Sequence, residues 1–296
     1  MSLRHLIIGA SGLVGGHLLR ALERAGEPVS GTYCSDPLPN LLHLDMKDPQ
    51  EVGKVLDQIR PEVVYLPASN PNVEWCEEHP DEAYEVNVQA TQRAIEAIVT
   101  HGGRAVFFST DYVFDGRNGP YTEEATPHPM NVYGRHKLMV ERFLLNTSPQ
   151  SLVVRTTVVY GVEKKQKNFV YSLLKRHKNG EVMKVPVDQV SSPTYAYNAA
   201  QLTVQLALKG QAGIFNVVGK DIISRYEFAL KAAEIFGLDK ALIQPITTDQ
   251  LNQKAPRPLR AGLLVDKAVA ATDLPALGVE AGLSAFKQEL ETPEGF

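Results

Sequence analysis

Hydrophobic residues in the first half of the chain follow two alternating patterns. Short apolar runs rich in β-branched residues are separated by longer segments whose apolar positions recur at helical spacing, clearest at 13–25, 81–101 and 133–147. The short runs, which we interpret as buried strands, are 4–8, 28–33, 41–44, 62–66, 105–109 and 151–155. This alternation predicts an α/β fold with a doubly wound parallel sheet and helices on both of its faces.

The composition argues against several classes of protein. The chain has 296 residues with 44% apolar and 22% charged side chains, and its net charge of −4 does not suggest nucleic acid as a partner. The two cysteines, Cys34 and Cys76, lack metal-ligand spacing and favour a reducing compartment. The first apolar stretch is too short for a signal peptide or a membrane span, so we expect a cytoplasmic protein without a metal or a membrane partner.

A glycine-rich turn follows the first strand. In "IIGASGLVGG", Gly9, Gly12 and Gly15 stand between a strand and a helix. Such a turn lets the backbone approach a pyrophosphate at the helix N-terminus, and Ser11 can add a hydroxyl donor. Because a second strand follows the helix, this context predicts a dinucleotide-binding Rossmann fold.

The pattern becomes less regular after about residue 160. Further helices are expected at 168–180, 191–210 and 224–237, and a strand at 213–219. These pieces look too irregular to continue the sheet and suggest a smaller, partly interleaved C-terminal lobe. The predicted domains are 1–160 for NAD(P), with a later contribution near 190–220, and 161–296 mainly for the substrate.

The end of the second strand bears on the choice between NAD and NADP. Residues 32–35 ("TYCS") occupy the place where an acid would bind the ribose 2′-hydroxyl of NAD. Asp36 comes slightly late and could instead cap the turn before Pro37, and no arginine is present for a 2′-phosphate. NADP, with NADPH as the reductant, is favoured, and NAD stays open. Asp45, after the third strand, suits either the adenine amino group or a helix cap.

A tyrosine stands four residues before a lysine at three places: Tyr133 and Lys137, Tyr160 and Lys164, and Tyr171 and Lys175. The second pair falls in a charged loop, where this spacing does not place two side chains on one face. The third pair is expected on the solvent-facing side of a helix, and contact with a substrate phosphate is the alternative role of this basic group.

Only Tyr133 begins a helix soon after a strand that ends in Ser109 and Thr110. In an open parallel sheet, ligands bind beyond the carboxyl ends of the strands. Lys137 shares a helix face with Tyr133, and its charge would lower the tyrosine pKa from about 10. A tyrosine tuned in this way can donate a proton near neutral pH.

Three segments together, "GASGLVGG", "STDYVFDG" and "NVYGRHK", resemble the extended short-chain dehydrogenase/reductases. The sequence is more closely similar to the dTDP-4-dehydrorhamnose reductases, through "RTTVVYG", "NFV", "DQVSSPT", "SRYEFAL" and "RPLR", over nearly the whole chain. This resemblance implies hydride transfer from NADPH to a nucleotide-linked 4-keto-6-deoxysugar.

The resemblance also implies roles for individual residues. Tyr133 would protonate the alkoxide, Lys137 would hold the nicotinamide ribose, and Thr110 would hydrogen-bond the carbonyl oxygen. Asn87 would order the site, or else make only a helix-packing hydrogen bond. The expected cofactor-binding residues are Gly9, Ser11, Gly12, Leu13, Val14, Gly15, Thr32, Tyr33, Asp45, Met46, Leu66, Ala68, Ser109, Tyr133 and Lys137. The expected substrate-binding residues are Asn70, Asp111, Tyr112 and Asn168.

The sequence also departs from the pattern of related families. Nucleotide-sugar dehydratases carry Thr-Asp-Glu where this chain has Thr-Asp-Tyr (110–112), which argues against a dehydratase. The stretch 66–80 differs from the usual one, and Val158 stands where rhamnose reductases often carry a tryptophan. Two alternatives stay open: an epimerase of the same fold, and a non-catalytic NADP-binding subunit resembling the regulatory subunit of methionine adenosyltransferase. A homodimer is one alternative for the oligomeric state.

Overall fold

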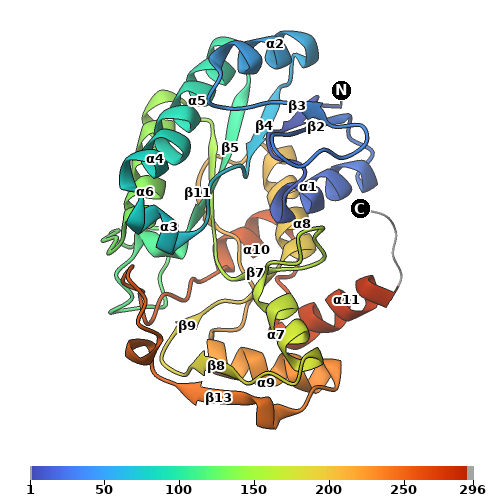
Figure 1. The fold of residues 1–296 in the computed structure, drawn as a ribbon. Coiled ribbons are helices and arrows are strands. Elements are labelled where there is room, and N and C mark those ends of the chain that lie inside the picture. Colours follow the sequence, from blue (N-terminus) through green and yellow to red (C-terminus); the bar gives the residue numbers. More distant parts are fainter. Residues whose placement is uncertain (1, 292–296) are drawn as a thin grey trace.

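The computed structural model describes residues 2–291 and has a seven-stranded parallel sheet at its centre (Figure 1). The strand order is β11-β6-β5-β4-β1-β2-β3, which is the Rossmann order and confirms the predicted doubly wound sheet. The strands are β1 (His5–Ile7), β2 (Val29–Tyr33), β3 (Leu42–His43), β4 (Val63–Leu66), β5 (Arg104–Thr110), β6 (Leu152–Thr156) and β11 (Gly213–Asn216).

Side chains of the central strands point alternately into two hydrophobic cores. In β1 and the residue after it, Leu6 and Ile8 lie in one core and Ile7 in the other. The helices packed on the first face are α2 (Pro49–Ile59), α5 (Ala90–Thr100) and α6 (Val132–Thr147). The second face is covered by α1 (Leu13–Arg24), α8 (Ala196–Leu208) and α10 (Asp266–Thr272). Burial on both faces explains why these strands are almost continuously apolar.

The strand β11 corrects one expectation. The second half of the chain was expected not to continue the sheet, yet β11 pairs in parallel with β6, from Gly213 opposite Leu152 to Asn216 opposite Arg155. This strand has four residues and lies at the sheet edge, with Phe215 buried beneath α8 and α10. So short a run carries little periodicity, although its apolar residues mark it as a strand. The predicted domain boundaries stay a prediction.

The remaining elements after residue 160 form a lobe with its own core (Figure 1). Its helices are α7 (Phe169–Lys178), α9 (Arg225–Phe236) and α11 (Val279–Glu291). Its strands form three pairs: β7 (Val159–Tyr160) with β10 (Thr194–Tyr195), β8 (Met183–Pro186) with β13 (Ile243–Ile246), and β9 (Val190–Ser191) with β12 (Ile223–Ser224). A capping box of Ser224 and Glu227 begins α9, and left-handed Gly237 ends it, as its sequence predicts.

The predicted helix over 81–101 contains an irregular turn. It consists of α4 (Pro80–Tyr84), a π-helical turn (Glu85–Gln89) and α5, and it follows a short helix, α3 (Val73–Glu78). Single π turns inside helices occur frequently at functional sites. Short 3-10 turns cover Asp111–Val113, Lys240–Leu242 and Thr248–Leu251. Within residues 2–291, no helix is both long and apolar enough to cross a membrane.

Candidate active site

A cavity of about 920 Å³ opens at the carboxyl ends of the central strands, between the sheet and the second lobe. It is lined by most of the predicted site residues: Gly9, Ser11, Gly12, Leu13, Val14, Gly15, Asp45, Met46, Ala68, Asn70, Ser109, Thr110, Asp111, Tyr112, Tyr133, Lys137 and Asn168. The structure does not place Thr32, Tyr33, Leu66 or Asn87 on its wall. No group of three or more His, Cys, Asp or Glu side chains suited to a metal occurs among the described residues.

The glycine turn brings α1 close to the end of β1. A Cβ atom on Gly15 would lie 2.1 Å from the Gly9 carbonyl oxygen, so the helix can approach only without a side chain there. Gly9 has a φ of 97°, and its N–H donates to the Thr32 hydroxyl at 3.2 Å. The Thr32 side chain is fully buried and supports the glycine turn. This corrects the prediction that Thr32 contacts the cofactor directly. Gly12 caps α1 without a side-chain hydrogen bond, so the helix N-terminus faces the cavity and fits a pyrophosphate.

Three of the other expected contacts have structural roles. Tyr33 packs edge-on against His43, with ring centroids 5.5 Å apart, and Leu66 lies in the core. Asp45 lines the cavity and accepts a hydrogen bond from the Lys47 N–H at 2.9 Å. The cap of α2 is Asp48, so Asp45 does not cap that helix, and its contact with the adenine amino group stays a prediction.

The start of α6 fixes Tyr133 against the turn after β5. A Cβ on Gly134 would lie 2.1 Å from the Tyr112 carbonyl oxygen, and the rings of Tyr112 and Tyr133 meet edge-on at 6.2 Å. Asn131 caps the helix by accepting from the Gly134 N–H at 2.8 Å, and its Nδ2 donates to the Pro256 carbonyl at 2.9 Å. The start of α6 is thus held by contacts with two other parts of the chain, the turn at Tyr112 and the segment at Pro256.

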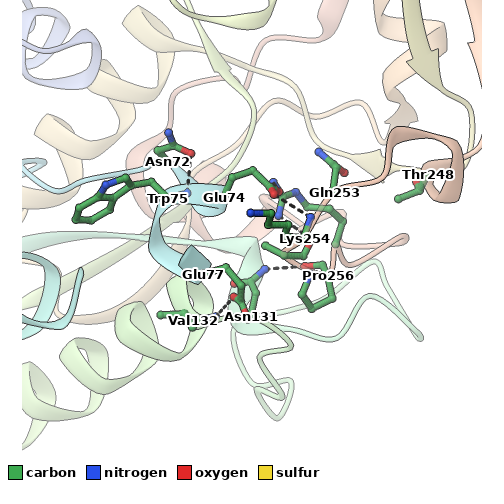
Figure 2. A network of polar contacts seen from close by, with 12 residues as sticks. Asn72, Glu74, Trp75, Glu77, Asn131, Val132, Thr248, Gln253, Lys254 and Pro256 are labelled. Atoms are coloured by element: carbon green, nitrogen blue, oxygen red, sulfur yellow. Dashed lines mark hydrogen bonds and ion pairs between the residues drawn. The ribbon is translucent and has the colours of Figure 1, made fainter. Parts of the chain in front are cut away.

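Helix α3, in the unusual 66–80 stretch, connects the start of α6 at Val132 with the segment at Lys254 (Figure 2). The Glu77 carboxylate accepts from the Val132 N–H at 2.9 Å, and Glu74 accepts from the Lys254 N–H at 2.9 Å. Glu74 also accepts from Arg257 at 2.6 Å, and this guanidinium lies over the Tyr112 ring. Helix α3, where the sequence departs from the usual pattern, therefore links α6 to the segment 254–257, which lies next to the cavity residue Pro258.

Lys137 is 3% exposed and lies one turn after Tyr133. Its Nζ donates to the Phe108 carbonyl at 2.8 Å and to the Ser69 hydroxyl at 3.2 Å. Within residues 2–291 no carboxylate forms an ion pair with it, and burial lowers its pKa to about 8. The Nζ lies 5.7 Å from the centroid of the Tyr133 ring.

The pKa of Tyr133 differs from the expectation. Burial, and secondarily the Asp111 carboxylate, raise it above its usual value instead of Lys137 lowering it. Burial raises the pKa of Asp111 to about 7, although hydrogen bonds from Thr157 and Thr110 oppose this shift. The Thr110 hydroxyl donates to Asp111 at 3.1 Å and accepts from the Tyr112 N–H at 3.2 Å. At neutral pH Tyr133 therefore carries its proton, as a donor must.

Asn87 is 2% exposed and acts on the loop after β4. Its Oδ1 accepts from the Asn70 N–H at 2.8 Å, and its Nδ2 donates to the Asn70 carbonyl at 3.1 Å. Asn87, on the π-helical turn, thus holds the backbone of a cavity-lining residue and does not itself reach the cavity. Its side chain makes more than a helix-packing hydrogen bond.

The other two tyrosines lie in the core of the second lobe. Tyr160 is 1% exposed and is the last residue of β7, just before the charged loop, as predicted. The prediction that Tyr171 faces solvent is wrong, because it is 9% exposed and packs edge-on against Phe286 at 5.5 Å. Lys175 on the same helix is exposed.

Several cavity residues were missed by the sequence patterns. Ser69 binds Lys137, and Arg225 lines the substrate-lobe side with its guanidinium over the Phe169 ring at 5.2 Å. Asn168, which was expected to bind substrate, lines the cavity and also caps α7 by accepting from the Tyr171 N–H at 3.4 Å. Val158 lines the cavity with a φ of 42°, rare for a β-branched residue.

A glycine turn at one end of the cavity and Thr110, Tyr133 and Lys137 at the other define a site of the extended short-chain dehydrogenase/reductase class. Residues 3–292 match the RmlD substrate binding domain, and the chain belongs to this family. A dTDP-4-dehydrorhamnose reductase of Aggregatibacter actinomycetemcomitans is 33% identical over 276 residues, 89% of this chain and 91% of that protein.

Two further comparisons extend this result. The methionine adenosyltransferase 2 subunit beta of Danio rerio is 32% identical over 267 residues, 88% of this chain and 82% of that protein. A solved dTDP-4-dehydrorhamnose reductase from Bacillus anthracis in complex with NADP superposes with a TM-score of 0.88 at 27% identity, covering 99% of this chain and all of that one. Both the enzyme and the regulatory subunit that the sequence suggested are therefore among the relatives.

The contact of α6 with the 111–113 turn gives a prediction about stability. We expect Gly134→Ala to destabilise the fold by about 1–3 kcal/mol, because the added methyl would overlap the Tyr112 carbonyl. The control is Gly53→Ala in α2, where nothing lies within 4 Å of the added Cβ, and it should stabilise by up to about 1 kcal/mol. Urea unfolding measures both, and equal effects of the two changes would contradict this packing.

The buried ammonium of Lys137 gives a second prediction. Its folded pKa of about 8 lies below the usual 10.5. Between these values the unfolded chain binds more protons, so the free energy of unfolding should rise with pH across this window. At pH 7 the buried charge costs about 3 kcal/mol, and the two hydrogen bonds of the charged ammonium offset this by about 1.5–3 kcal/mol each.

The wild type should therefore gain about 2–3 kcal/mol of stability between pH 7 and about pH 10 that Lys137→Met does not gain, so the variant should compare more favourably with the wild type at pH 7 than at pH 10. Urea unfolding of the wild type and the variant at pH 7 and at about pH 10 tests the difference. A variant that is less stable by the same amount at both pH values would mean that Lys137 is not a costly buried charge.

Proposed function

We propose that the protein is an NADPH-dependent reductase of a nucleotide-linked 4-keto-6-deoxysugar, a function like that of its dTDP-4-dehydrorhamnose reductase relatives. The observation that carries the proposal is the convergence of Thr110, Tyr133 and Lys137 on one cavity with the Gly9–Gly15 turn. A bound NADPH would supply a hydride to the keto carbon. NADPH as cofactor also agrees with the related enzyme solved with NADP.

The protein's residues would bind, orient and supply the proton. The N-terminus of α1, free of a side-chain cap, would hold the pyrophosphate, and Lys137 would hold the nicotinamide ribose. Tyr133 would donate its proton to the substrate oxygen as the alkoxide forms. Thr110 would turn its hydroxyl from Asp111 to the same oxygen, a change that protonation of Asp111 near pH 7 makes easier.

The substrate would lie on the side of the cavity formed by the second lobe. Arg225 lines that side, and no carboxylate within the described part of the chain forms an ion pair with its guanidinium. A guanidinium binds phosphate oxygens well, which suits the diphosphate of a nucleotide sugar. Asn70, Asp111, Tyr112 and Asn168 line the cavity, and we expect them to contact the sugar nucleotide.

Two other functions fit the same fold. An epimerase would use Tyr133 and Lys137 but would not consume NADPH overall. A regulatory subunit, like the methionine adenosyltransferase 2 subunit beta, would bind a synthetase and could keep the three residues without using them. The reductase is favoured because all three residues line the cavity and because dTDP-4-dehydrorhamnose reductases are among the relatives and the similar solved structures.

The test is NADPH oxidation with a panel of nucleotide-linked 4-keto-6-deoxysugars. We expect stoichiometric oxidation with at least one sugar, and a loss of about 10²-fold or more for Tyr133→Phe, since the proton donor is removed. Tyr171→Phe, a buried tyrosine with the same spacing to a lysine, is the matched control and should retain activity.

Sugar interconversion without net NADPH oxidation would favour the epimerase. Failure of every sugar, together with copurification of a synthetase, would refute the reductase. A Tyr133→Phe variant with wild-type activity would refute the role of this hydroxyl.

A further inference from the structure

The cavity continues past the glycine turn to the ends of β2 and β3. Ser35, Asp36 and Lys47 line this part, together with Lys165 from the loop after β7. When a dinucleotide lies on a Rossmann sheet, the group at its adenosine ribose 2′ position lies at the end of the second strand. No arginine stands at the end of β2 in this chain. The cations at this end of the cavity are instead two lysines, Lys47 from the loop after β3 and Lys165 from a segment far along the sequence.

Asp36 and Lys165 form an ion pair across this end of the cavity. The Ser35 hydroxyl donates to the same carboxylate at 2.8 Å. These contacts, with Lys165 first, lower the pKa of Asp36. Both side chains are partly exposed, 44% for Lys165 and 34% for Asp36, so the pair costs little to open. Asp36 thus has a partner in the other lobe beyond its place in the turn before Pro37.

We propose that Asp36 and Lys165 together select the group at the ribose 2′ position of the cofactor. The 2′-phosphate of NADPH would repel Asp36 and take over Lys165, with Ser35 as a hydroxyl donor. The 2′-hydroxyl of NADH would leave the ion pair intact and donate to the free lone pairs of Asp36. This pair of Asp36 and Lys165, which we call the selector, explains how the end of β2 can bind the cofactor although residues 32–35 include no acid and no arginine.

The selector also couples the cofactor to the second lobe. Lys165 belongs to the loop between β7 and α7, which also carries the cavity residue Asn168. A phosphate bound by Lys165 would hold this loop against the end of β2. This inference rests on the proposed function only in taking a nicotinamide dinucleotide as the cofactor.

Direct titration of the purified chain with NADPH and with NADH, without sugar, tests the inference. Lys165→Met should raise the Kd for NADPH about tenfold, because one charge-assisted contact to the phosphate is lost, and leave the Kd for NADH within about twofold. Asp36→Asn should act in the opposite direction, binding NADPH several-fold more tightly and NADH more weakly. Lys164→Met is the matched control, since Lys164 is exposed and does not line the cavity.

The outcomes separate this inference from the proposed function. Equal changes in both Kd values for Lys165→Met, or an equal effect of Lys164→Met, would overturn the selector. A chain that binds NADPH through Lys165 but reduces no sugar would support the selector and remove the reductase. A chain that binds neither dinucleotide would overturn both.

Discussion

The burial of the Lys137 ammonium is the constraint on which the site depends. A charge taken out of water needs compensating donors or acceptors, and here it has one carbonyl from β5 and one hydroxyl from the loop after β4. The strands β4 and β5 are adjacent in the parallel sheet. The site therefore depends on the loop after β4 lying beside the carboxyl-terminal part of β5. The lowered pKa of Lys137 shows that these two partners do not fully compensate for burial of the charge. A bound ribose would add hydrogen-bond acceptors and would reduce the free-energy cost of that burial.

The rest of the structure supports this position and that of Tyr133. Asn87 holds the loop that carries Ser69 by binding both backbone groups of Asn70. Gly134 lets α6 touch the turn after β5, and α3 connects the start of α6 to the segment around Pro256. Most of these contacts join residues far apart in sequence, which makes the site a product of the whole fold.

Local sequence patterns predicted the parts of the molecule that are local in origin. The strand and helix alternation, the turn at Gly9–Gly15 and the start of α6 at Tyr133 all follow from short-range rules. The predictions were wrong where a contact with a residue far away in the sequence determines the position of a side chain or strand. Tyr171 was assigned to solvent because its partner Phe286 lies on α11. The strand at β11 was predicted, but its place in the central sheet was not, because that place is set by pairing with the distant strand β6. The ion pair of Asp36 with Lys165 has no local signal at all.

We propose that Tyr133 protonates the reduced carbonyl oxygen of a nucleotide-linked keto sugar. A crystal structure of the chain with NADP and a nucleotide-linked deoxysugar tests it most directly. We expect the pyrophosphate of the dinucleotide at the Gly9–Gly15 turn and the sugar oxygen at C4 within hydrogen-bond distance of the Tyr133 hydroxyl. A sugar bound elsewhere, or a Tyr133 hydroxyl that faces no ligand while the dinucleotide is in place, would contradict the account.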